Sequence, residues 1–274
     1  MEVVYECGIN CNGSMDIAEK MIDVAHSSGC KYVKFQKRTI DLVYSKEELA
    51  RPRDSQWGTT TREQKEGLEF NWTDYRKIDD YCRGKCISWF ASPWDTESIQ
   101  FLVDFNKDLM KIPSALITNH EFLEECRDTG AYLILSTGMC HINDIDAAID
   151  IIGKERIYCL MHCTSTYPSM PEEINAKCII TLKELYPKLM IGFSNHYPGL
   201  MAMILAAAYG AEMIEFHGTL DRAMVGSDQA ASIEPQGVFE LMQRLQLVEK
   251  MKGDGVKRIY EREYPIIDKL RGIK

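Results

Sequence analysis

The sequence has no run of basic residues, and its 41 Asp and Glu outnumber its 32 Lys and Arg, which gives a formal net charge of −9. A nucleic-acid partner or an anionic membrane surface would require clustered Lys and Arg, so we expect neither. No apolar run approaches the ~20 residues of a membrane span. The N-terminal stretch MEVVYECGIN lacks the regions of a signal peptide, and we expect a cytoplasmic protein.

Motifs for disulfides, zinc and nucleotides are also missing. The ten cysteines are scattered and include no Cys-x-x-Cys pair, which indicates reduced thiols. The turn GINCNG is not a G-x-G-x-x-G fingerprint, and no P-loop occurs. These absences disfavour a dinucleotide-binding open sheet.

Eight short apolar runs recur along the chain, with helix-like periodicity between them. The runs are 3–9, 32–36, 88–93, 109–114, 132–137, 157–164, 189–196 and 211–218. One helix is expected between the N-cap Ser14 and Gly29, another ends at Gly153, and TNHE at 118–121 predicts a capping box. Eight strand–helix units in about 250 residues predict an α/β protein, a single-domain (β/α)₈ TIM barrel over 1–274. A doubly wound sheet is the alternative.

Two segments fall outside the repeating pattern. The excursion 37–87 is long and polar, and we expect it to lie over the mouth of the barrel. The tail from about 253 is charged and adds no further domain.

Each apolar run ends in side chains capable of chemistry, and a TIM barrel places its active site at those strand ends. The residues are Glu6, Lys34, Gln36, Ser92, Lys111, Ser114, Ser136, Thr164, Ser165, Ser194, His196, Glu215 and His217. One such residue would mean little, because serine at a strand end is commonly a turn residue. Polar ends on all the runs are hard to explain by packing.

The stretch IEFHG places Glu215 and His217 on one face of an expected strand, because residues i and i+2 point the same way. An unpaired buried carboxylate is costly, so that face needs a partner, a metal or a substrate. A core ion pair is the simpler alternative. His196 ends the neighbouring strand, and two facing imidazoles suit a catalytic divalent metal with open positions. Separately hydrogen-bonded core histidines are the other interpretation.

Two lysines at strand ends, Lys34 and Lys111, accompany the serine hydroxyls. Such donors suit a small anion that carries phosphate and carboxylate groups. A lysine in this place could instead form a Schiff base, as in class I aldolases. Two lysines together with several hydroxyls favour anion binding.

The motifs at these positions resemble one family, the sialic acid (N-acetylneuraminate) synthases and their nonulosonic-acid relatives. They occur in the family's order from residue 6 to about 235. The matching stretches are ECGINCNGSMDIAEKMID, VKFQ, FASPWD, KIPSALITN, ILSTGM, HCTSTYP, GFSNH and HGTLDRAMVGSDQAASIEP.

The resemblance implies a transferase that condenses phosphoenolpyruvate with an aldose, such as N-acetylmannosamine, and releases phosphate. It implies a divalent metal, typically Mn²⁺ with Mg²⁺ or Co²⁺ as alternatives, on His196 and His217. Phosphoenolpyruvate would be held by Lys34, Ser92, Lys111, Ser114, Ser136, Ser165 and Ser194. The sugar would meet Gln36, Tyr167 and Asp228. The catalytic residues would be Glu6, which acts on the attacking water, and Glu215, which orients ligands or moves protons.

The sequence departs from the family's pattern in three places. Cys11 stands where the family often has His, and Ser165 where several members have Asn, so both are expected to retune the sugar pocket. The sequence also stops where members continue into an antifreeze-like domain, which caps the partner subunit's site and supplies an arginine to the N-acetyl group. We therefore expect 37–87 to close the site, and the acceptor to be chosen without an N-acetyl contact.

Three functions remain open at this point. The first is the nonulosonic-acid synthase, with small-molecule substrates and an assembly compatible with a homodimer. The second is a related synthase whose acceptor is a sugar phosphate, or one that makes an eight-carbon analogue. The third is a barrel that lost catalysis, which the costly buried charges disfavour.

Overall fold

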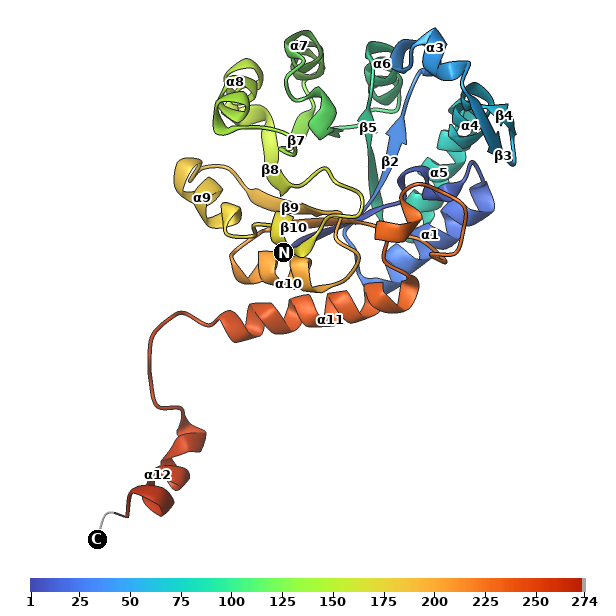
Figure 1. Ribbon diagram of the computed structural model, residues 1–274. Helices are drawn as coiled ribbons and strands as arrows, with labels where there is room; N and C mark the ends of the chain where they lie inside the picture. The colour runs from blue at the N-terminus through green and yellow to red at the C-terminus, as the bar shows by residue number, and fades with distance from the viewer. Residues whose placement is uncertain (273–274) are drawn as a thin grey trace.

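The computed structural model describes residues 1–272 and is built around a closed barrel of parallel strands (Figure 1). Its strands are β1 (Glu2–Glu6), β2 (Tyr32–Lys37), β5 (Ser88–Pro93), β6 (Leu109–Ile112), β7 (Tyr132–Ser136), β8 (Ile157–Cys163), β9 (Ile191–Asn195) and β10 (Met213–His217). The first strand, β1, pairs in parallel with both β2 and β10, which closes the barrel. The predicted strands and the TIM-barrel fold are therefore confirmed.

Helices cover the outside of the barrel (Figure 1). They are α1 (Met15–Ser28), α5 (Trp72–Lys85), α6 (Thr96–Asp104), α7 (His120–Asp128), α8 (Ile142–Ile152), α9 (Cys178–Leu185), α10 (Met201–Ala208) and α11 (Pro235–Lys252). Short 3₁₀ segments are η1 (Gly8–Cys11), η2 (Ser114–Leu116), η3 (Lys154–Arg156), η4 (Pro171–Glu173), η5 (Gln229–Ala231) and η6 (Glu261–Glu263).

Three of the four predicted helix ends are confirmed. The Ser14 hydroxyl accepts a hydrogen bond from the Ile17 N–H at the start of α1, and Gly29 ends that helix with φ 87°. Gly153 ends α8. The capping box predicted at 118–121 is wrong, because Asn119 caps α7 and accepts from the Phe122 N–H.

The barrel interior changes from apolar to polar along each strand. Its lower layer is an apolar cluster of Val4, Tyr32, Phe90, Ile134, Cys159, Met161 and Met213. Two residues further along, on the same inward face, stand Glu6, Lys34, Ser92, Ser136, Cys163 and Glu215. The inward face of the strands therefore forms an apolar layer at one end of the barrel and presents functional groups at the other.

The excursion 37–87 contains α5, the barrel's own helix, and a compact unit before it. This unit comprises α2 (Ile40–Val43), α3 (Lys46–Leu49), the hairpin β3 (Pro52–Ser55) and β4 (Gly58–Thr60), and α4 (Thr61–Leu68). It packs closely against the turn between η1 and α1: a Cβ on Gly13 would lie 2.0 Å from the Gly67 carbonyl oxygen. Figure 1 shows the hairpin beside α4 at the edge of the barrel.

The last helix, α12 (Tyr264–Arg271), stands apart from the barrel. Residues 253–272 extend away from α11 and are almost entirely exposed (Figure 1). Within the described range 1–272, no helix combines the length and apolarity that a membrane crossing requires.

Candidate active site

A cavity of about 190 Å³ opens at the C-terminal ends of the barrel strands. The residues predicted for the site line it, with the exception of Cys11, Thr164 and Asp228. Polar residues scattered from Glu6 to His217 therefore converge on one hollow, because parallel strands of a closed barrel bring their ends to the same mouth.

Two lysine–glutamate pairs form the floor of the cavity. The Lys34 ammonium lies 2.8 Å from Oε2 of Glu6 and 3.6 Å from Oε1 of Glu215. The Lys111 ammonium donates to Oε1 of Glu215 at 2.5 Å. All four side chains are buried, so each charge depends on its partner for compensation.

The ionisation of these groups follows from that pairing. Burial acts to raise the pKa of Glu215, but the charges of Lys111 and Lys34 outweigh it and hold the pKa below its usual range. Burial likewise acts to lower the pKa of Lys34, yet Glu215 and Glu6 hold it above its ordinary value. Lys34 and Glu215 are therefore both charged at neutral pH.

Serine hydroxyls surround the lysines. Lys34 donates to Ser92 at 3.4 Å, and Lys111 donates to Ser194 at 3.3 Å. Ser114 accepts from the Gly138 N–H at 3.0 Å, which fixes it beside the loop after β7. The Ser136 hydroxyl is buried without a hydrogen-bond partner among the described residues, so it is free to bind a ligand.

The two histidines face each other across the mouth, with ring centroids 5.4 Å apart. His196 Nδ1 lies 2.6 Å from the Thr164 carbonyl oxygen, so Nδ1 carries the proton and donates. This bond leaves the lone pair of Nε2 for a ligand. Burial, the adjacent His217 and Lys111 lower the pKa of His196 to about 3, although the Thr164 bond acts against this, so the ring stays neutral.

This donor set fits a divalent metal whose coordination is completed from outside the protein. The Nδ1 atom of His217 is buried without a hydrogen-bond partner and lies 3.5 Å from Oδ2 of Asp228. Across residues 1–272, no group of three or more His, Cys, Asp or Glu is placed to hold a metal. The two imidazoles would thus be the protein's main contribution, with water or substrate in the remaining positions.

Side chains predicted to meet the sugar lie toward the outside of the cavity. The Tyr167 ring packs against His196 with centroids 3.9 Å apart and is 49% exposed. Gln36 donates through Nε2 to Oε1 of Glu6 at 2.6 Å. Asp228 does not line the cavity and instead approaches it through His217.

The cavity also includes residues that the sequence did not single out: Trp94, Pro113, Ala115, Met139 and Cys163. Trp94 and Met139 lie within the stretches FASPWD and ILSTGM at the ends of β5 and β7, and that position is the signal that could have identified them.

One predicted role is not supported by the geometry. Cys11, expected to retune the sugar pocket, is 1% exposed, contacts the sulfur of Met21 and does not line the cavity. It lies on the inner side of η1, where a small apolar residue packs against α1. Ser165, in contrast, lines the cavity as predicted.

The excursion reaches the site from the side. None of the residues that line the cavity belongs to 37–87. The excursion contacts the site through Gln36: Arg38 donates to its side-chain Oε1, and the Tyr75 hydroxyl donates to its backbone carbonyl at 2.8 Å.

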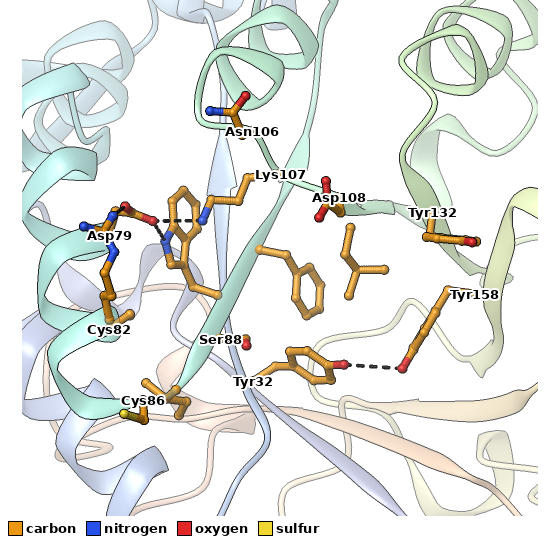
Figure 2. Close-up of a pocket in the computed structure, with 15 residues that line it drawn as sticks. Tyr32, Asp79, Cys82, Cys86, Ser88, Asn106, Lys107, Asp108, Tyr132 and Tyr158 are labelled. Atoms are coloured by element: carbon orange, nitrogen blue, oxygen red, sulfur yellow. Dashed lines mark hydrogen bonds and ion pairs between the residues drawn. The ribbon is translucent and has the colours of Figure 1, made fainter.

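A larger hollow of about 590 Å³ lies at the opposite, N-terminal end of the barrel (Figure 2). Its floor is aromatic, and its buried charges are matched, since Asp79 accepts from Lys107 at 2.9 Å and from the Trp89 indole at 2.8 Å. Tyr32 and Tyr158 close one side with their hydroxyls 3.3 Å apart. Paired groups of this kind stabilise this end of the barrel. The smaller cavity, at the C-terminal ends of the strands, is therefore the candidate active site.

Known proteins resemble this chain over almost its full length. The NeuB family model matches residues 21–257. N-acetylneuraminate-9-phosphate synthase of Homo sapiens is 33% identical over 271 residues, which cover 98% of this chain and 76% of that protein. N,N'-diacetyllegionaminic acid synthase of Campylobacter jejuni is 32% identical, with coverage of 98% and 82%.

A solved structure shows the same likeness in three dimensions. The N-acetylneuraminic acid (sialic acid) synthetase of Leptospira borgpetersenii, crystallised with citrate, is 30% identical. It superposes with a TM-score of 0.82, covering 99% of this chain and 91% of that one.

Proposed function

The chain belongs to the NeuB family of sialic and nonulosonic acid synthases, and from this premise we propose that it condenses phosphoenolpyruvate with an aldose. The products would be a nonulosonic acid and inorganic phosphate. The observation that carries the proposal is the convergence of Lys34 and Lys111, with unpaired or weakly paired serine hydroxyls, in one buried cavity. Such a set of donors suits a small, multiply charged anion.

The donor substrate would lie over the lysines. Its carboxylate and phosphate would accept hydrogen bonds from Lys34 and Lys111, with Ser92, Ser114, Ser136, Ser165 and Ser194 as further donors around it. A buried position raises the strength of each contact, because the local dielectric is low.

A divalent metal would be held by His196 and His217, with Mn²⁺ as the proposed ion. The neutral state of His196 and the unpartnered Nδ1 of His217 support this assignment. When bound, such an ion acts as a Lewis acid toward the aldehyde oxygen of the acceptor. The stacked ring of Tyr167 would fix the plane of His196.

Proton transfer would fall to the carboxylates. Glu6 accepts a hydrogen bond from Gln36 at Oε1, and its Oε2 lies 2.8 Å from the Lys34 ammonium, so its position is fixed relative to the donor site. We assign it to the water that attacks C2 of the intermediate. Glu215, next to Lys111 and two residues from His217, would orient ligands or move protons.

The acceptor would bind at the outer side, against Gln36, Tyr167 and Asp228. Free and phosphorylated aldoses both remain candidates, because proteins named as synthases of a 9-phosphate and of a non-phosphorylated acid are similarly close to this chain. We propose that the acceptor is not selected through an N-acetyl contact. A barrel without activity is disfavoured, since the ionisable set of the site is intact.

The decisive experiment measures phosphate release from phosphoenolpyruvate with a panel of aldoses. The panel holds N-acetylmannosamine, mannose, their 6-phosphates and a five-carbon sugar phosphate for the eight-carbon product. Release that depends on one acceptor supports the synthase. No release with any acceptor and any divalent metal would overturn it, and a strong demand for the N-acetyl group would overturn the proposed selectivity.

A further inference from the structure

Arg38, the first residue after β2, is a buried cation beside the acceptor side of the cavity. Its side chain is 10% exposed, and its guanidinium lies over the Trp94 ring at 4.3 Å from the centroid. One of its terminal nitrogens donates to Oε1 of Gln36. The mechanism proposed above leaves this residue without a role.

We infer that Arg38 is a positioning residue, which sets the orientation of the Gln36 amide and through it the geometry of Glu6. The inference rests on the proposed function. A guanidinium only donates hydrogen bonds, so the amide oxygen of Gln36 has to face Arg38. The amide nitrogen is then turned to Glu6, where it donates to Oε1 at 2.6 Å.

The alternative orientation of this amide is unfavourable at both ends. A rotation of the Gln36 side-chain amide by half a turn would bring its NH₂ against the guanidinium and its oxygen against the Glu6 carboxylate. Donor would meet donor and acceptor would meet acceptor in a buried site. Arg38 and Glu6 therefore select together one of two orientations that have the same shape, which a residue without hydrogen-bond donors in place of Arg38 could not support.

Several contacts hold Arg38 itself in place. Its backbone N–H donates to Oε2 of Glu69 at 3.3 Å, and its guanidinium lies 3.6 Å from Oε1 of the same side chain. The next backbone N–H, of Thr39, donates to Asp95 at 2.7 Å. Glu69 stands at the end of α4, so the excursion supports the site through the series Glu69, Arg38, Gln36 and Glu6.

This series gives the excursion a function other than covering the mouth. It contributes no lining residue, but its α4 end fixes the cation that orients a cavity-lining amide. The expected signature is a selective loss of acceptor binding and turnover, with phosphoenolpyruvate binding retained, because Lys34, Lys111 and the serines do not contact Arg38.

The test compares Arg38→Met, which keeps the length and removes the donors, with Arg38→Lys, which keeps one donor. Arg62→Met is the matched control, since Arg62 lies in the same excursion but contacts only Asp41 and Glu66. Arg38→Met should lower kcat/KM for the acceptor about tenfold or more, the loss typical of a charge-assisted hydrogen bond. The KM of Arg38→Met for phosphoenolpyruvate should stay within about twofold of the wild-type value. Arg38→Lys should recover part of the lost kcat/KM. The control Arg62→Met should have wild-type values for both substrates.

A double-mutant cycle decides whether Arg38 acts through Gln36. In the Gln36→Met background, Arg38→Met should cause no further loss, because the amide that it orients is gone. Additive losses, equal defects for both substrates, or no difference between Arg38→Met and wild type would overturn the inference. An inactive wild-type enzyme would overturn the proposed function instead, and the two failures are thereby distinguished.

Discussion

The imidazole of His196 faces that of His217 from the adjacent strand, with ring centroids 5.4 Å apart and an interplanar angle of 56°. Both rings are 5% exposed. The Thr164 carbonyl fixes the tautomer of His196, and Oδ2 of Asp228 lies 3.5 Å from Nδ1 of His217. A backbone contact such as that of His196 orients a metal-binding imidazole and raises its basicity.

We expect chelation to abolish phosphate release, and added Mn²⁺ to restore it, if these rings bind one divalent ion. His196→Gln and His217→Gln should each lose the metal that elemental analysis detects in the wild-type protein. His120→Gln, at an exposed position on α7, is the control. Full activity in chelator, or unchanged metal content in both variants, would contradict the assignment.

Lys111→Ala is expected to raise the KM for phosphoenolpyruvate about tenfold or more, because a buried charge-assisted contact is worth roughly 1.5–3 kcal/mol. Lys183→Ala, on the outside of the barrel, should leave KM unchanged. Steady-state kinetics measure both. Borohydride trapping of a pyruvyl–lysine adduct would show a Schiff-base aldolase and refute anion binding by this lysine.

Gly138→Ala should weaken phosphoenolpyruvate binding with little effect on the Tm. A Cβ at this position would lie 2.1 Å from Oγ of Ser165 and 2.9 Å from Oγ of Ser114, so both hydroxyls must move. Gly84→Ala on α5 is the control, because its Cβ meets open space and alanine favours a helix. If Gly138→Ala leaves the KM for phosphoenolpyruvate at the wild-type value, these serines do not hold the donor.

Asp79→Asn is expected to destabilise the barrel at neutral pH and to matter less in acid. Burial acts to raise the pKa of Asp79, but the hydrogen bonds from Lys107 and Trp89 outweigh it and hold the pKa below its ordinary value. As the pH falls, Asp79 therefore takes up its proton at a lower pH in the folded protein than in the unfolded chain. This stability is fully present above about pH 4 and is lost as pH falls through the lowered pKa.

Urea unfolding at pH 7 and pH 3 measures that difference. The substitution should cost about 1–2 kcal/mol at pH 7, in the range for a hydrogen bond to a charged group, and less at pH 3. An equal cost at both pH values would mean that the carboxylate's charge contributes nothing.

Much of the barrel could be predicted from the sequence, because the two-residue alternation of side chains along a strand is a local pattern. Glu6, Lys34 and Glu215 each follow an inward apolar residue by two positions, so strand pleating alone predicts their shared direction. Closure of the barrel then brings them together. The position of Cys11 could not be predicted in this way, since it depends on how η1 turns and packs against α1.

The excursion shows the same limit. Its polar composition indicated a surface segment, but its hairpin and helices are arranged by contacts such as that between Gly13 and Gly67, which are distant in sequence. The role of Arg38 was equally hidden, because it depends on Glu69 and Trp94 approaching from two other segments. Contacts of this kind, between residues far apart in the sequence, produce no periodic pattern from which they could be predicted.

The two lysine–glutamate pairs on the cavity floor make the resting site electrically balanced. Under the proposed function, an anion bound at Lys34 and Lys111 would share these ammonium groups with Glu6 and Glu215. Binding of the donor substrate would therefore weaken the hold of each lysine on its carboxylate, while Gln36 keeps its hydrogen bond to Glu6. The carboxylates proposed to handle water and protons would thus become more basic only when the substrate is in place.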